Sequence, residues 1–134
     1  MKAPNFKYAR AATIEEACAL LERHGDDARI LAGGQSLMPT LNMRLSSPSL
    51  LIDIKRIETM RGIALDGDAI RIGALVRHAE LADSAVVQRH LPLLSAAIAH
   101  VAHPAVRNRG TFGGSIALAD PAAELPACAV ALEA

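Results

Sequence analysis

Two pairs of adjacent glycines, far apart in the chain, constrain its fold most. The first lies in Ala32-Gly33-Gly34-Gln35-Ser36-Leu37 and the second in Thr111-Phe112-Gly113-Gly114-Ser115, each near a hydroxyl side chain. Adjacent glycines let the backbone turn tightly and expose its N–H groups, because no Cβ stands in the way. Successive N–H groups that point one way form a concavity that binds an anion. We therefore expect two loops around one extended phosphate-bearing ligand, such as a dinucleotide.

The composition indicates a folded protein without a nucleic-acid or membrane partner. Its 134 residues suffice for a core of their own, and 51% of them are hydrophobic. Aromatic residues make up only 2%, so no platform for stacking bases is evident. The 14 basic residues balance 14 acidic ones, which gives no support for binding polyanions. No apolar run reaches transmembrane length and no signal peptide is visible, so we predict a cytoplasmic protein.

Cysteine and histidine give no sign of a metal centre in this chain. Cys18 and Cys128 are predicted to be buried thiols, and without a Cys-x-x-Cys pair the chain itself does not bind an iron–sulfur cluster. His100 and His103 could face one side of a helix, but no third ligand is evident nearby. No metal site is therefore predicted.

The first part of the chain predicts a small β-α-β unit. Thr13, with Glu16 three residues later, is a capping box that begins an amphipathic helix over 13–24, and Gly25 is placed to end it. Three further elements are predicted here: a buried strand over 29–32, a short helix from Pro39 to about Arg44, and a strand over 50–54.

The pattern changes at a subdomain boundary predicted near 56–61. Residues 62–74 alternate around Asp66-Gly67, which predicts a hairpin. The later predictions are a helical turn or two over 77–82, an amphipathic helix that begins near Pro92, includes Val101 and is ended by Pro104, and a last helix with Asp120 as N-cap and Pro121 at its first position. Leu125, Cys128, Ala129 and Val130 supply the apolar face of that last helix. We expect the natural fold to continue beyond Ala134.

Each glycine segment has a simpler interpretation when taken alone. Either pair could be an ordinary tight turn, and neither matches Gly-x-Gly-x-x-Gly or a P-loop. Arg107 and Arg109 could attract an anion, but the favoured interpretation is that they are solvated or bond helix-end carbonyls. The combination of two glycine pairs, at the edges of two subdomains, makes dinucleotide binding plausible.

Three motifs together resemble a known family: Ala32 to Pro39, Arg107 to Ser115, and Ala119 to Pro126. They are similar to the FAD-binding medium subunit of molybdenum hydroxylases, the family of carbon monoxide dehydrogenase and xanthine dehydrogenase. The similarity runs along the whole chain, including the opening strand Asn5-Phe6-Lys7-Tyr8, and corresponds to the N-terminal portion of that subunit. It implies an α+β FAD-binding fold of the vanillyl-alcohol oxidase-like (PCMH) type, with a first subdomain over 1–58 and the start of a second over 59–134.

The resemblance also implies which residues bind FAD between the two subdomains. It assigns Ala32, Gly33, Gly34, Gln35, Ser36 and Leu37, and Thr111, Gly113, Gly114 and Ser115, chiefly to the pyrophosphate and neighbouring parts. Val101 and Ala102 match positions near the flavin, although Val101 could simply be a core residue. Glu124 matches an acidic position that bonds the adenosine end, although it could simply favour a helix dipole. Ser115 departs from the Asn or Asp of many relatives.

The family mechanism places this chain in an electron-transfer complex. The resemblance implies a molybdopterin-binding large subunit, a small subunit with two [2Fe–2S] clusters, and electrons that pass through FAD to NAD or another acceptor. This chain shows no evident catalytic acid, base or nucleophile, so its expected role is to hold and tune the flavin. Two alternatives are a truncated fragment or interaction module without flavin, and a cell-wall-precursor reductase type of flavoprotein. The Arg107 to Gly114 motif argues against the second alternative.

Overall fold

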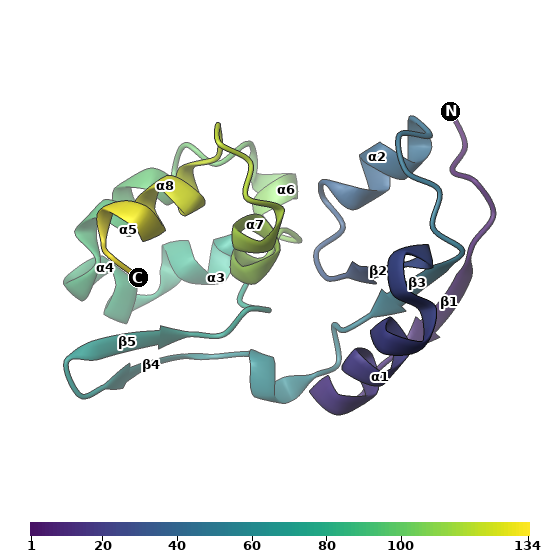
Figure 1. Ribbon diagram of the computed structural model, residues 1–134. Helices are drawn as coiled ribbons and strands as arrows, with labels where there is room; N and C mark the ends of the chain where they lie inside the picture. The colour runs from purple at the N-terminus through teal and green to yellow at the C-terminus, as the bar shows by residue number, and fades with distance from the viewer. The chain divides into compact units, whose positions relative to one another are not determined.

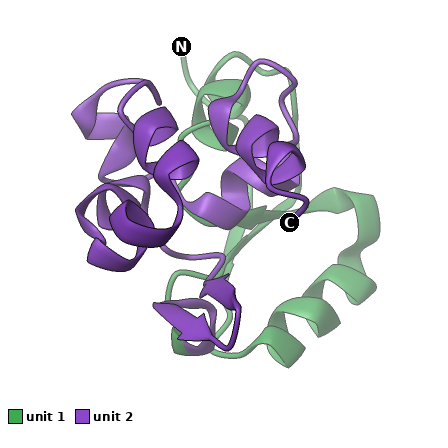
Figure 2. Cartoon of the chain, turned by 90° about the vertical axis from the view of Figure 1, so that its left-hand side faces the viewer, with its two compact units in different colours: residues 1–58 green, residues 59–134 purple.

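A computed structural model describes all residues from Met1 to Ala134. The chain divides into two compact units, Met1–Glu58 and Thr59–Ala134 (Figure 2). No helix in either unit combines the length and the apolar character needed to span a lipid bilayer.

The first unit is built on a parallel sheet of three strands in the order β1-β3-β2 (Figure 1). These are β1 (Lys7–Arg10), β2 (Ala28–Leu31) and β3 (Leu50–Asp53), with Ile52 of β3 in register with Ala9 and Ile30. All four residues of the central strand β3 are buried. A parallel strand needs cover on both faces, so its sequence is a continuous apolar run rather than an alternating one.

Helices α1 (Ile14–His24) and α2 (Leu37–Asn42) cover the two faces of this sheet. Leu41 of α2 packs with Leu31 and Leu51 on one face. Because side chains alternate along a strand, Leu50 and Ile52 of β3 point to the other face, which α1 covers through its contacts with β2 and β3.

Helix α1 begins and ends where the sequence predicts. Thr13 is the N-cap, and its Oγ1 accepts a hydrogen bond from the Glu16 N–H at 3.2 Å, while the Glu16 carboxylate accepts one from the Ala12 N–H at 2.8 Å. Gly25 is the C-cap with φ 50°. A short 3-10 helix, η1 (Gly25–Asp27), then leads into β2.

A hairpin opens the second unit, after the 3-10 helix η2 (Glu58–Met60) at the boundary. Strands β4 (Ile63–Asp66) and β5 (Ala69–Ile72) pair antiparallel. The predicted hairpin is confirmed, but its turn lies one residue later, at Gly67-Asp68, because Asp66 pairs with Ala69. Gly67 has φ 61°, and a glycine with positive φ at the first of two turn positions matches the twist of the strands.

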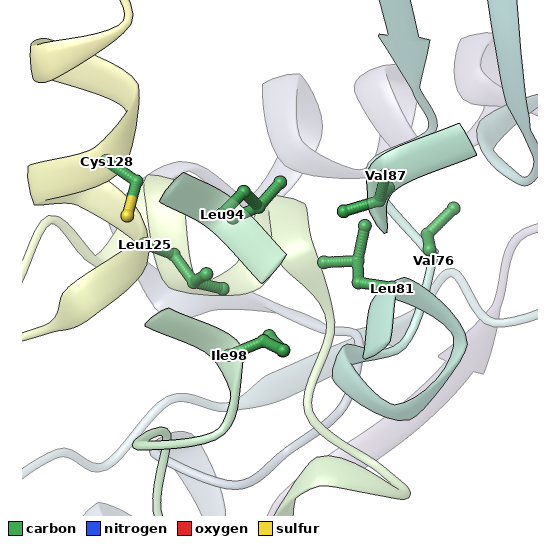
Figure 3. Close-up of a cluster of buried hydrophobic side chains, with 7 residues drawn as sticks. All are labelled: Val76, Leu81, Val87, Leu94, Ile98, Leu125 and Cys128. Atoms are coloured by element: carbon green, nitrogen blue, oxygen red, sulfur yellow. The ribbon is translucent and has the colours of Figure 1, made fainter. Parts of the chain in front are cut away.

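Six short helices complete the second unit around one core. They are α3 (His78–Asp83), α4 (Ala85–His90), α5 (Pro92–Ile98), α6 (Pro104–Arg107), α7 (Phe112–Leu118) and α8 (Glu124–Ala131). Figure 3 shows the core of this unit, formed by Val76 and by side chains of α3, α4, α5 and α8, namely Leu81, Val87, Leu94, Ile98, Leu125 and Cys128. Helices this short are marginal in isolation, so this core stabilises them.

The predicted helix that begins near Pro92 is shorter than expected. It ends at Ile98, before Val101, and Pro104 begins helix α6 rather than only ending its predecessor. Proline suits a first helical position, where its missing N–H has no intrahelical role. The prediction that His100 and His103 share a helix is therefore wrong, because both lie in the connection.

Three further predictions are wrong, two at the C-terminal helix and one at a cysteine. Asp120 does not cap α8: its carboxylate accepts a hydrogen bond from the Ala122 N–H at 2.9 Å, a local turn that competes with helix initiation, and the helix begins at Glu124. Val130 is 80% exposed rather than on the apolar face. Cys128 is buried as expected, but Cys18 is exposed on α1.

Candidate functional site

The first glycine segment follows β2 and leads into α2, as predicted, although α2 begins at Leu37 rather than at Pro39 and ends at Asn42. Gly34 has φ 72°, a left-handed conformation that disfavours any side chain. A Cβ added there would lie 3.1 Å from Leu31 Cδ1 and 3.3 Å from Met38 Cγ. The positive φ therefore favours glycine at this position, and a Cβ would also make tight contacts with two side chains.

This segment presents unpaired backbone donors. The N–H groups of residues 33–37 donate to no group of the protein, and the first helical hydrogen bond runs from the Met38 N–H to the Gly34 carbonyl at 3.0 Å. Gln35 Nε2 donates to the Gly33 carbonyl at 3.1 Å and so holds the turn. Consecutive free N–H groups around a left-handed residue are the arrangement that binds an anion.

The second glycine segment differs from the predicted loop, because it forms the first turn of α7. Thr111 is the N-cap, and its Oγ1 accepts a hydrogen bond from the Gly114 N–H at 3.3 Å. The N–H groups of Phe112 and Gly113 donate to the carbonyls of Val76 and Ala74 at 2.8 and 2.9 Å. These donors are occupied, so an open cradle of N–H groups like that of the first segment does not form here.

The two glycines of this second segment have different roles. Gly113 allows close packing, since a Cβ there would lie 2.4 Å from Ala74 Cβ and 2.7 Å from its Cα. Gly114 is exposed, and a Cβ there would meet only Thr111 Oγ1, at 2.7 Å. Ser115 carries a half-buried hydroxyl without a hydrogen bond in the chain. The open surface at Gly114 and Ser115 is what this segment offers to a ligand.

Arg107 bonds backbone carbonyls, which confirms the favoured interpretation for this residue. Its Nη1 donates to the carbonyls of Val101 and Ala102, each at 3.0 Å. Val101 is half-buried, whereas Ala102 is exposed with φ 46°. Arg109 is exposed, and its side chain makes no hydrogen bond within the chain.

His78, at the start of α3, is a buried group that the sequence did not single out. It is 6% exposed, and neither ring nitrogen has a hydrogen-bond partner. The ring lies against Gly110, where an added Cβ would be 2.9 Å from its Cε1. Burial lowers the pKa of His78 and the Arg107 charge lowers it further, while the nearby Thr111 backbone opposes this shift. The ring is therefore neutral near pH 7.

A second unforeseen group lies at the end of β3, where the buried Asp53 carboxylate meets three partners. It accepts hydrogen bonds from the Tyr8 hydroxyl and from the Lys55 N–H, the latter at 2.8 Å, and pairs with Lys55 Nζ at 3.3 Å. Burial alone would raise the pKa of Asp53, but Tyr8 and Lys55 together hold it below its ordinary value. An acid that ends a buried apolar strand is the only signal in the sequence for this group.

Glu124 stands in the first turn of α8, half-buried and with no hydrogen bond to its carboxylate. Burial raises the pKa of the Cys128 thiol, and the Glu124 charge one turn away adds to this effect. An acid near a helix N-terminus is favoured by the helix dipole, which is the simpler interpretation of Glu124. The free carboxylate oxygens also leave Glu124 able to accept hydroxyl hydrogen bonds.

No group of three or more acidic, His or Cys side chains is arranged to hold a metal ion.

Comparison with known proteins identifies the class to which this arrangement belongs. Residues 4–134 match the family described as "FAD binding domain in molybdopterin dehydrogenase", and the chain belongs to that family. The predicted α+β FAD-binding fold is thereby confirmed, and FAD is the cofactor of this domain family.

Individual relatives are similar over nearly the whole chain. The 6-hydroxypseudooxynicotine dehydrogenase complex subunit alpha of Paenarthrobacter nicotinovorans is 54% identical over 100% of this chain and 45% of its own length. The structure of carbon monoxide dehydrogenase from Hydrogenophaga pseudoflava has a TM-score of 0.96 at 46% identity, covering 98% of this chain and 46% of the other. Quinoline 2-oxidoreductase from Pseudomonas putida 86 has a TM-score of 0.90 at 44% identity, over 94% and 44%. The chain thus spans somewhat under half the length of these relatives.

Proposed function

We propose that this chain binds FAD as part of the medium subunit of a molybdenum hydroxylase-type dehydrogenase. The observation that carries the proposal is the run of unpaired N–H groups at residues 33–37, with left-handed Gly34 among them. A pyrophosphate is an anion with many acceptor oxygens, so it matches this set of donors. FAD supplies the capacity to accept electrons and pass them on.

The remaining proposed contacts come from the second unit. Gly114 and Ser115 offer an accessible surface at the start of α7, the turn at Val101 and Ala102 lies near the flavin, and Glu124 accepts hydroxyl hydrogen bonds from the ribose. The unpaired Glu124 carboxylate and the free Ser115 hydroxyl support these roles. The proposed FAD-binding residues are Ala32, Gly33, Gly34, Gln35, Ser36, Leu37, Val101, Ala102, Thr111, Gly113, Gly114, Ser115 and Glu124.

In the complex, the substrate is oxidised elsewhere and this chain relays its electrons. The proposed partners are a molybdopterin-binding large subunit and a small subunit with two [2Fe–2S] clusters, and NAD or another acceptor takes the electrons from FAD. Relatives named for 6-hydroxypseudooxynicotine, caffeine and carbon monoxide share 42–54% identity with this chain. This similarity across unlike substrates supports a role in electron transfer rather than substrate choice. A cytoplasmic location stays a prediction from the sequence.

Titration of the purified protein with FAD tests the proposed function. We expect saturable binding, with the visible absorption bands of an oxidised flavin retained through gel filtration. Gly34→Val should abolish retention, because a β-branched residue resists positive φ and its side chain would meet Leu31 and Met38. Gly25→Val is the matched control, since Gly25 also has positive φ but faces open space at the end of α1. If Gly34→Val retained as much FAD as Gly25→Val and the wild type, residues 32–37 would form an ordinary turn.

Substitution of Glu124 tests the proposed ribose contact. Glu124→Ala removes the carboxylate that would accept the ribose hydroxyls, and we expect the FAD binding free energy to weaken by roughly 1.5–3 kcal/mol. The flavin absorption maximum should stay in place, because the contact is remote from the isoalloxazine ring. Glu133→Ala, which changes an exposed acid past the end of α8, is the control. Unchanged affinity in both variants would leave Glu124 with its helix-dipole role alone.

A further inference from the structure

The turn between α5 and α6 contains a strained residue. Ala102 has φ 46°, in the left-handed region that residues with a Cβ rarely adopt. Strained residues persist only where the surrounding structure holds them, and they concentrate at ligand-binding sites. The partners of this turn therefore indicate what maintains its shape.

Arg107 is the side chain that holds the turn. Its Nη1 donates to the carbonyls of Val101 and Ala102 at 3.0 Å each. These hydrogen bonds are charge-assisted and end on consecutive peptide groups, so one guanidinium orients two peptide planes. No carboxylate of the chain pairs with Arg107, and the two carbonyls are the only hydrogen-bond partners of its side chain.

The backbone next to Arg107 is tied to the start of α7. The Gly110 N–H donates to the Val106 carbonyl at 2.7 Å, and the Gly110 carbonyl accepts from the His78 N–H at 3.0 Å. Thr111, the next residue, caps α7. Helix α6 therefore connects the turn at 101–102 to the start of α7, and the side chain of Arg107 supplies the connection to the turn.

We propose that Arg107 is a positioning residue for FAD, which holds the turn at Val101 and Ala102 in place relative to the start of α7. This inference rests on the proposed function, in which the turn and residues 111–115 contact the cofactor. Arg107 itself does not touch FAD in this proposal. It acts by fixing the peptide groups that do.

Three variants separate this role from a general attraction of charge. Arg107→Met keeps a long apolar stem but has no donor, and the dissociation constant for FAD should rise at least about tenfold, as the loss of a charge-assisted hydrogen bond predicts. Arg107→Lys keeps the charge without the planar fork and should lose less affinity. Arg109→Met removes an exposed arginine that makes no hydrogen bond within the chain, and should bind FAD as the wild type does.

Chemical rescue separates positioning from folding. Millimolar guanidinium should restore part of the FAD affinity of Arg107→Ala and leave the wild type unchanged, while the FAD-free variants melt close to the wild type. Wild-type affinity in Arg107→Met overturns the inference, as does equal weakening in Arg107→Met and Arg109→Met. A loss of affinity that guanidinium does not restore, together with a lower melting temperature without FAD, would assign Arg107 to folding alone. A wild type that binds no FAD would contradict the proposed function itself and overturn both.

Discussion

At the scale of single residues, burial decides the protonation of His78. The imidazole is surrounded by protein, neither ring nitrogen has a partner, and the Arg107 charge lies close enough to oppose protonation. The pKa of the folded state therefore lies below the ordinary value of 6.5. Asp53 shows the opposite balance, because its partners stabilise the charged form and outweigh burial.

The lowered pKa of His78 predicts a pH-dependent stability. Between the folded-state pKa and 6.5, the unfolded chain binds more protons than the folded one, so the free energy of unfolding rises with pH across this window. We expect full stability above pH 6.5 and a loss as the pH falls below it. Urea unfolding at a series of pH values measures the slope. His78→Phe should reduce the slope of the free energy of unfolding against pH. His100→Gln, at an exposed histidine, should leave this slope as in the wild type. An unchanged slope in His78→Phe would show that another group causes the pH dependence.

At the scale of elements, the chain relies on short helices that need caps and packing. Helix α1 has a cap of its own in Thr13 and Gly25, whereas α8 begins at Ala123 and Glu124 without a side-chain cap. Helix α8 is held instead by Leu125 and Cys128 in the core of the second unit. The two helices thus depend on different interactions, one local and one tertiary.

The cap of α1 predicts a measurable loss of stability. Thr13→Ala removes the oxygen that accepts the Glu16 N–H, and the free energy of unfolding should fall by about 1 kcal/mol. Thr13→Ser keeps the hydroxyl and should stay near the wild type. Denaturant unfolding gives both values. Because Thr13 lies outside the proposed FAD residues, affinity for FAD should be the same in all three proteins, and a change in affinity would contradict that assignment.

At the scale of the whole molecule, FAD should contribute to folding stability. A ligand that binds only the folded state stabilises it by mass action, by about 2.7 kcal/mol at a free concentration one hundred times its dissociation constant. The melting temperature should therefore rise with FAD concentration. FMN, which lacks the adenosine half, should raise it less if Glu124 binds the ribose of that half. An equal rise with FMN and FAD would count against the Glu124 contact.

The features that the sequence determined by itself are local. Thr13 and Glu16, which cap the start of α1, are three positions apart, the hairpin depends on a turn of two residues, and Gly34 lies in the short segment after strand β2. Such signals act through steric limits and hydrogen bonds between near neighbours, so they can be recognised in the sequence without knowledge of the fold. The three motifs that resemble the FAD-binding family are likewise short runs of neighbouring residues.

The tertiary structure alone decided which of the two glycine pairs keeps its donors free. Both pairs look alike in the sequence, but the Gly113 N–H of the second pair donates to the Ala74 carbonyl and the Gly114 N–H to Thr111 Oγ1, while nothing in the chain accepts the N–H groups of the first pair. In the same way, the fold buried His78 against Gly110, a residue far from it in the sequence. The physical reason is that a backbone donor bonds whichever segment the fold brings to it, and that segment is not encoded in its own neighbourhood.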